Sequence, residues 1–126
     1  MGCHSEVWPE SVQLEPVRRS YFSGKPLRWQ RVHELPDYVY FDHSIHVNKG
    51  VGCVSCHGRV DRMALVYQVA PLSMGWCLDC HRSPEDHLRP LDQVTRMDWQ
   101  PQPGQGSELA QLYGVRRLTH CTTCHR

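Results

Sequence analysis

One five-residue pattern, C-x-x-C-H, occurs three times in this chain of 126 residues and uses six of its seven cysteines. The copies span Cys53–His57, Cys77–His81 and Cys121–His125. Each copy places two thiols three positions apart and a histidine directly after the second thiol. Because the spacing is the same each time, we expect three equivalent sites that constrain how the chain around them folds.

These residue types at this spacing are the attachment signal of a c-type haem. The two thiols form thioether bonds with the vinyl groups of the porphyrin, and the histidine becomes the proximal ligand of the iron. The sequence therefore predicts covalent haem at three sites. The predicted attachment residues are Cys53, Cys56, Cys77, Cys80, Cys121 and Cys124, and the predicted proximal ligands are His57, His81 and His125.

Zinc binding and disulfide formation are two alternative uses of the cysteines. The first two pairs are spaced like those of a zinc ribbon, which binds its metal through four side chains. A zinc ribbon leaves the third pair without partners and gives no role to the histidine after each pair. A disulfide within C-x-x-C closes a small strained ring that stabilises little. Haem is the interpretation that uses all these residues.

The composition indicates one small domain that depends on a cofactor. Mean hydropathy is −0.55, and phenylalanine occurs only twice, so a core of side chains alone is small for 14.6 kDa. The net charge of +1 gives no sign of the basic face typical of nucleic-acid binding. No stretch approaches the ~20 apolar residues of a transmembrane helix. We therefore expect a single multihaem domain over residues 1–126.

The first four residues, Met1–His4, have the form of a C-x-x-C-H motif that lacks its first cysteine. Proteins with c-type haem mature outside the cytoplasm, yet the chain shows no export signal. An alternative is a disordered terminus with a stray cysteine. One cause explains both observations if Met1 is an internal methionine of a longer chain. On that hypothesis Cys3 and His4 belong to a further haem site, and the complete chain carries four haems or more.

An electron-transfer haem has a second axial ligand, usually histidine or methionine. His43 and His46 are three positions apart, and on one helical turn such a pair can face two different irons. His33 precedes this pair and is a further candidate. The other candidate ligands are Met63, Met74 and His120. For a methionine, core packing is the commoner role, and His87 lies in a polar stretch typical of the surface.

The pattern of the chain predicts a mostly irregular and α-helical multihaem cytochrome c fold, with short helices and loops wrapped around the haems and little β-structure. Prolines predict a loop over 5–37. A short strand is expected over 39–41, and alternating apolar residues predict a strand or an extended segment over 62–69. Proline and glycine predict a loop over 98–106. Arginines such as Arg59, Arg62 and Arg82 suit pairing with haem propionates.

Two helix starts are predicted in the second half of the chain, and the motifs themselves are expected in tight helical turns. Ser83 followed by Pro84 marks the first start. Ser107 is expected to cap a helix over 108–113 that ends at Gly114. Leu109 and Leu112 share one face of that helix and are expected to pack on a haem.

The motifs and the paired histidines resemble class III multihaem cytochromes c. Their flanks resemble, more specifically, the pentahaem cytochrome c subunit of bacterial alternative complex III. The resemblance spans most of residues 27–126. It is carried by the segments 31–37, 41–47, 50–61, 72–82 and 118–126. The paired histidines of that family correspond to His43 and His46, and its upstream histidine corresponds to His33.

The resemblance implies an electron carrier without bond-making chemistry, in a membrane quinol-oxidising complex at the extracytoplasmic (periplasmic) face of the bacterial cytoplasmic membrane. The implied partners are an iron–sulfur/molybdopterin-like subunit, a monohaem cytochrome c and quinol-binding membrane subunits, with a terminal oxidase as a further acceptor. Members of the family carry an N-terminal anchor and two earlier motifs; here the first motif is missing and the second is cut at Cys3.

Two other functions stay open at this point. A free periplasmic shuttle of the class III type usually displays a strongly charged docking face, which the net charge of +1 does not indicate. A multihaem reductase needs one iron with an open position, and the chain has enough histidines and methionines to fill every position.

Overall fold

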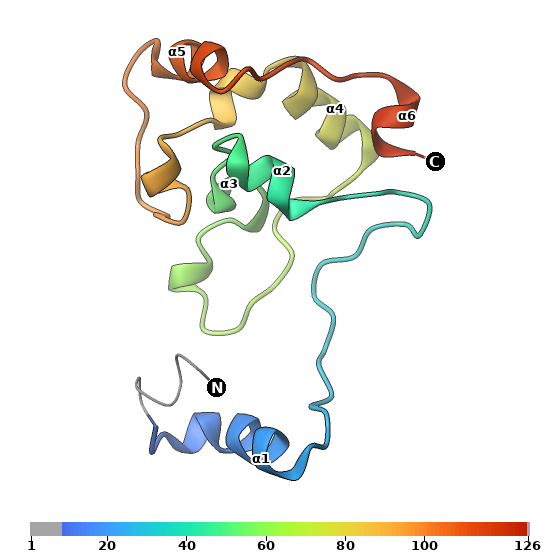
Figure 1. Ribbon diagram of the computed structural model, residues 1–126, viewed down its shortest axis with the longest axis vertical. Helices are drawn as coiled ribbons and strands as arrows, with labels where there is room; N and C mark the ends of the chain where they lie inside the picture. The colour runs from blue at the N-terminus through green and yellow to red at the C-terminus, as the bar shows by residue number, and fades with distance from the viewer. Residues whose placement is uncertain (1–8, 126) are drawn as a thin grey trace. The chain divides into compact units, whose positions relative to one another are not determined.

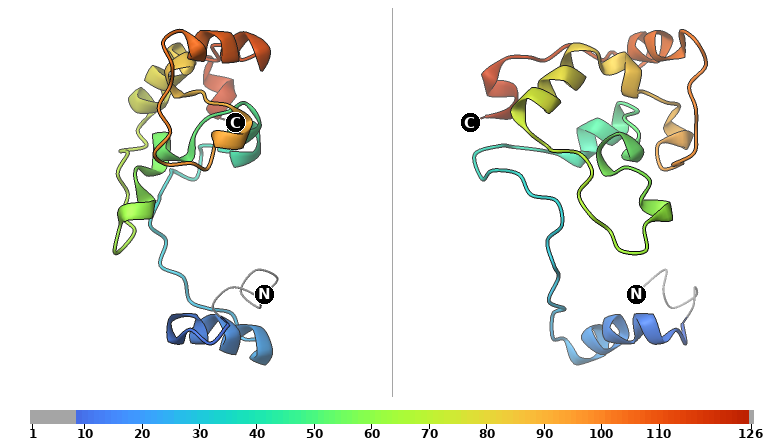
Figure 2. Two further views of the ribbon diagram at one scale, coloured as in Figure 1. Left: turned by 90° about the vertical axis from the view of Figure 1, so that its left-hand side faces the viewer. Right: turned by 180° about the vertical axis from the view of Figure 1, so that it is seen from behind.

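The computed structural model describes residues 9–125, and Cys3 and His4 lie outside them. The chain separates into two units, residues 1–31 and 32–126. Figures 1 and 2 show short helices joined by long irregular segments, and the described residues contain no strand. This confirms the predicted fold class. In chain order the elements are η1 (Val12–Leu14), α1 (Glu15–Ser23), α2 (His43–Asn48), α3 (Cys53–His57), η2 (Val60–Arg62), α4 (Met74–Arg82), η3 (Pro84–His87), η4 (Leu91–Gln93), α5 (Gln105–Leu112) and α6 (Cys121–Cys124).

The first unit contains α1, so the prediction of a loop over 5–37 is wrong for residues 12–23. Pro16 lies in the first turn of α1, where its missing N–H and fixed φ are compatible with a helix. Arg19 and Glu15 form an ion pair one turn apart at 2.6 Å. Gly24 then ends the helix in the left-handed conformation, at φ 68°. The proline therefore marks a helix start here rather than a break.

Neither 39–41 nor 62–69 forms a strand, so the short strand expected over 39–41 is absent, and of the two alternatives for 62–69 the strand is ruled out. Val60–Arg62 forms a 3-10 turn, and the residues up to 73 follow an irregular path. The apolar side chains that alternate there, such as Leu65 and Tyr67, are exposed, because no second strand pairs with this segment. At 39–41 the pairing is limited to one antiparallel bridge between Val39 and His125. Alternation alone thus did not identify a sheet.

Both predicted helix starts are present, but neither has the expected side-chain cap. Pro84 opens the short helix η3, although the Ser83 side chain makes no capping hydrogen bond. The helix α5 begins at Gln105, two residues before the predicted cap Ser107, so the predicted loop ends at Gly104. Its end near Gly114 is as predicted, since this glycine has φ 57°. Leu109 is buried, whereas Leu112 is exposed.

The apolar core of the second unit is small. Among the described residues, the buried apolar side chains are Ala70, Leu88, Val94 and Leu109. The core lies where the segment 50–52 pairs with 87–89. Arg89 N donates to Gly50 O at 2.9 Å, and Gly52 N donates to His87 O at 3.2 Å. A core this small is typical of a unit in which cofactors fill the space that side chains leave.

The described helices include none that is both long and apolar enough to cross a membrane.

Candidate haem-binding sites

Each C-x-x-C-H motif lies in a helical turn, as predicted. The first motif is the whole of α3, the second lies within α4, and the third forms α6. In a helix, residues three and four positions apart lie on one face. Both thiols of a motif and, in the first two motifs, the following histidine are therefore placed on one side. Ser73 begins α4 by accepting a hydrogen bond from Trp76 N at 3.3 Å.

The six motif cysteines form no disulfide bond with one another. Burial, with the charges of the neighbouring cysteines, raises the pKa of Cys80 to about 11. Burial also raises the pKa of Cys56 and of Cys77 above the ordinary value. Zinc binds thiolates. A zinc ribbon therefore requires these cysteines to lose their protons, although burial disfavours the charged form. The described residues contain no group of three or more histidine, cysteine or acidic side chains arranged to hold a metal ion.

Hydrogen bonds fix the tautomer of several histidines. A backbone carbonyl can only accept, so a ring nitrogen that contacts one must carry the proton. In each case that nitrogen is Nδ1, which leaves the lone pair on Nε2 for a metal. The Nδ1 contacts are His81 with Leu118 O at 2.8 Å, His125 with Tyr38 O at 3.3 Å, and His46 with Asp42 O at 2.8 Å.

The first motif histidine, His57, contacts another histidine instead of a carbonyl. Its Nδ1 lies 3.2 Å from Nε2 of His33. Burial, followed by the charges of His33 and His43, lowers the pKa of His57 and favours its neutral form. A neutral His57 that donates Nδ1–H to His33 keeps its own Nε2 available as a ligand.

The paired histidines of α2 face two different motifs. The rings of His43 and His57 have centroids 6.1 Å apart and planes inclined by 9°. The rings of His46 and His81 have centroids 6.2 Å apart and planes inclined by 62°. Asp42 caps α2 by accepting from Ser44 N at 2.8 Å. The predicted helical turn is therefore present, and it directs each histidine to a separate C-x-x-C-H motif.

Phe41 supports this arrangement. Its ring centroid lies 4.7 Å from that of His43 and 4.6 Å from that of His46. Because the ring of Phe41 contacts both imidazoles, it restricts the rotamers of both histidines. The sequence reasoning did not single out Phe41, although its position two residues before the pair is a usable signal.

The spacing of the histidine pairs fits an iron between them. Two imidazoles that bind one metal from opposite faces have ring centroids roughly 6 Å apart, because each metal–nitrogen bond is about 2 Å long. The pairs His43–His57 and His46–His81 both have this spacing. The nitrogens of His33 and His57, at 3.2 Å, are at hydrogen-bonding distance and too close to hold an iron between them.

The remaining ligand candidates lie at helix ends. Met74 is the first residue of α4 and is 68% exposed, and Met63 directly follows η2. His120 precedes α6, and His87 is the last residue of η3. Their roles as ligands stay predictions, as do those of Cys3 and His4, which lie outside the described residues.

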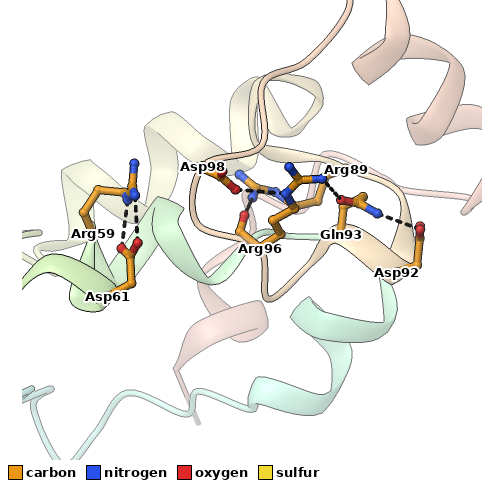
Figure 3. A network of polar contacts seen from close by, with 7 residues as sticks. All are labelled: Arg59, Asp61, Arg89, Asp92, Gln93, Arg96 and Asp98. Atoms are coloured by element: carbon orange, nitrogen blue, oxygen red, sulfur yellow. Dashed lines mark hydrogen bonds and ion pairs between the residues drawn. The ribbon is translucent and has the colours of Figure 1, made fainter.

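Arg89 is a site residue that sequence reasoning missed. It is 6% exposed, and its Nη1 donates to Arg96 O at 2.8 Å. Burial lowers the pKa of its guanidinium, and the nearby Cys53 opposes that shift. Figure 3 shows Arg89 beside the Arg96–Asp98 ion pair, with the Arg59–Asp61 ion pair further along. No pattern distinguishes Arg89 from other arginines in the sequence, because its burial depends on a tertiary contact.

Comparison with known protein families identifies the family to which the chain belongs. Residues 39–126 match the family described as cytochrome c7 and related cytochrome c, and the match includes all three motifs and the paired histidines. A search of curated proteins found no significant match. The matched region is well over half of the chain. The chain therefore belongs to the family of cytochrome c7 and related cytochromes c, which transfer electrons through covalently bound c-type haems.

Proposed function

We propose that this cytochrome is the electron relay of a membrane quinol-oxidising complex of the alternative complex III type. It works at the extracytoplasmic face of the bacterial cytoplasmic membrane and passes electrons toward a cytochrome c or a terminal oxidase. The observation that carries the relay function is that one short helix, α2, directs His43 and His46 to the histidines of two different motifs.

The proposed ligand pairs are His43 with His57 and His46 with His81. A bound c-type haem supplies reversible one-electron chemistry at its iron. The two histidines of each pair would together hold the iron of a bound haem and would leave no position on it for a substrate. Because α2 contributes to both pairs, the chain holds two redox centres close together. Irons held by two histidines and placed close together are what an electron relay needs, and they disfavour a reductase site at the first two motifs.

His33 has a different role in this arrangement. Its Nε2 lies at hydrogen-bonding distance from Nδ1 of His57, and we assign Nδ1–H of His57 as the donor of that hydrogen bond. An acceptor at this position orients a metal-bound imidazole and increases its basicity. If His33 also binds an iron, that iron is not the one bound by His57.

Coordination is tested with single variants of the haem-loaded protein. His43→Ala and His46→Ala each open one iron, so each variant gains one high-spin haem that binds carbon monoxide when reduced. The matched control is His87→Ala, which keeps the wild-type spectrum. Haem content is measured by pyridine haemochrome and intact mass, and we expect at least three haems per chain. Strong carbon monoxide binding by the wild-type protein would support a reductase instead.

Membership of a complex is supported by the resemblance of the motif flanks to the pentahaem subunit. The experiment is to tag the chain in its native host, solubilise the membranes gently and separate the extract by native size exclusion. We expect co-elution with an iron–sulfur/molybdopterin-like subunit, a monohaem cytochrome c and quinol-binding membrane subunits, identified by peptide mass spectrometry. Elution of the chain alone would identify a free shuttle and overturn the proposal.

A further inference from the structure

Positive charge is concentrated in the segment 16–31. This segment contains five cations and no acidic residue, whereas the whole chain has a net charge of only +1, so the other residues together carry −4. The charge of the whole chain hides this asymmetry. A short segment with several charges of one sign attracts an anionic surface within a Debye length. The five cations are Arg18, Arg19, Lys25, Arg28 and Arg31.

These cations lie at the surface of the first unit. Four of them are exposed, and Arg18 is half-buried. Arg19 pairs with Glu15, yet its side chain is 74% exposed. Lys25 and Arg28 take part in none of the ion pairs among the described residues. Their charges therefore face solvent without an acidic partner from the chain.

Three aromatic side chains of the same segment are also exposed. Tyr21 is 61% exposed, Phe22 78% and Trp29 81%. Tyr21 and Phe22 contact each other edge to face, with ring centroids 5.3 Å apart. Single exposed apolar residues are common, but three large exposed rings in so short a segment leave much apolar surface in water. Such a surface is typical of an interaction site.

The local fold holds cations and an aromatic ring near one another. Phe22 lies three positions after Arg19, so both share one side of α1, the blue helix of Figure 1. Ser20 Oγ donates to Lys25 O at 2.6 Å, and Lys25 N donates to Ser23 Oγ at 3.3 Å. These two bonds keep Lys25 beside the last turn of α1.

We propose that the segment 16–31 binds the anionic phospholipid surface of the membrane. The inference rests on the membrane location in the proposed function and adds lipid as a partner. Guanidinium groups bind phosphate through paired hydrogen bonds, and Lys25 adds a further charge. Tyrosine and tryptophan are favourable at the headgroup level of a bilayer. Because α1 has nine residues, it is far too short to span a bilayer, so the segment lies along the surface.

The order of the side chains favours lipid over an acidic protein as the occupant. The centre of a stable protein interface is apolar and depleted of charged residues. Here Lys25 and Arg28 stand between Phe22 and Trp29 in the chain, and all four are exposed. Aromatic residues interleaved with cations are typical of segments that lie in the interface of an anionic membrane.

Sedimentation of the haem-loaded protein with lipid vesicles tests the proposal, and gel densitometry measures the bound protein. The vesicles are phosphatidylcholine alone or with about 30% phosphatidylglycerol. We expect binding to the anionic vesicles only, and its loss in about 1 M salt, where the Debye length is about 3 Å. Lys25→Gln with Arg28→Gln should lower the partition coefficient about tenfold. Trp29→Ser should lower it severalfold without any change in charge.

The matched control is Arg116→Gln with Arg117→Gln, which removes the same charge from two exposed residues outside the segment. We expect this variant to bind like the wild type. Hydrogen exchange locates the contact, because amides of the segment 16–31 should exchange more slowly on the anionic vesicles. Equal losses in the two double variants, or no binding of the wild type, would overturn the inference. Retention on immobilised polyglutamate without vesicle binding would also overturn it, in favour of an acidic protein.

Failure of this inference is distinguishable from failure of the proposed function. The segment 16–31 contains no cysteine and no histidine, so its variants leave the haem motifs and the candidate ligands unchanged. Co-elution with the other subunits but no vesicle binding would overturn the lipid contact alone. Vesicle binding by a chain that elutes alone from the native extract would overturn membership of the complex and support the lipid contact.

Discussion

The first and third haem motifs differ in how the chain holds them. The first follows the segment 50–52, which pairs with 87–89, and Cys53 N donates to Val94 O at 3.0 Å. The third motif is attached by one bridge between Val39 and His125, by Tyr40 N, which donates to Cys124 O at 2.8 Å, and by the contact of His125 with Tyr38. Its first cysteine, Cys121, is exposed, whereas both cysteines of the first motif are half-buried.

This difference indicates two ways of building a haem site. At the first motif the backbone is positioned by the small apolar core, since Leu88 and Val94 lie in the segments that contact it. At the third motif few contacts act before the cofactor is attached, so the haem itself supplies most of the local order. We therefore expect changes near the first motif to affect the whole unit and changes near the third to stay local.

Removal of the thioether cysteines gives the largest expected contrast. Cys53→Ala with Cys56→Ala removes one covalent haem and leaves a cavity beside the core, which lowers the free energy of unfolding by at least about 5 kcal/mol. Cys121→Ala with Cys124→Ala also removes one haem, but we expect increased hydrogen exchange mainly near the third motif. Intact mass counts the haems, and urea unfolding measures stability. Equal losses in the two variants would contradict the contrast.

The next prediction concerns the close approach at Gly52. Gly52→Ala places a Cβ on the Arg89 guanidinium and displaces it, so we expect a loss of about 1–3 kcal/mol in the free energy of unfolding. Gly75→Ala, in α4 next to the second motif, is the matched control, because no atom of the chain lies within 4 Å of its Cβ. Chemical denaturation measures both. A loss at Gly75 as large as that at Gly52 would show that displacement of Arg89 is not the cause.

Sequence reasoning identified the elements whose signals are local. The motif turns, the helix that carries His43 and His46, and the start at Pro84 depend on neighbouring residues, and all are present. Of the two alternatives for 62–69, a strand or an extended segment, the strand does not form, because strand formation needs a distant partner that alternation does not reveal. The helix α1 was missed because Pro16 was interpreted as a break, although proline is also favourable in a first turn.

The site shows the same division. Its thiols and histidines could be named from spacing alone, but their tertiary partners could not. Nothing in the sequence indicates that His33 contacts His57, or that Arg89 is buried against Gly52. These contacts join segments more than 20 residues apart. They therefore follow from packing rather than from any pattern in the chain.

A smaller effect is expected at the connection that precedes the first motif. Lys49 donates from Nζ to Tyr113 O at 2.5 Å, next to the end of α5. The charge-assisted bond also satisfies a carbonyl at the end of that helix. Lys49→Met should lower the free energy of unfolding by about 1.5 kcal/mol. Thermal unfolding at matched haem content measures this loss. Unchanged stability of Lys49→Met would show that Lys49 does not help to order the first motif.

The corresponding connection before the third motif is weaker and depends on pH. Arg117 donates to Glu85 at 2.7 Å on the surface, so Glu85→Gln should cost less than about 1 kcal/mol. A backbone hydrogen bond and then the Arg117 bond lower the pKa of Glu85 below its ordinary 4.5. The stabilisation is therefore complete above pH 4.5 and is lost as the pH falls through the folded pKa.

Urea unfolding of the haem-loaded wild type and Glu85→Gln at pH 7 and at successively lower pH tests this dependence. The comparison cancels the titration of groups that both proteins share. The difference between them should be largest at neutral pH and should vanish in acid. A difference that persists in acid, or that exceeds the loss in Lys49→Met, would mean that the third motif is held as firmly as the first by the chain itself.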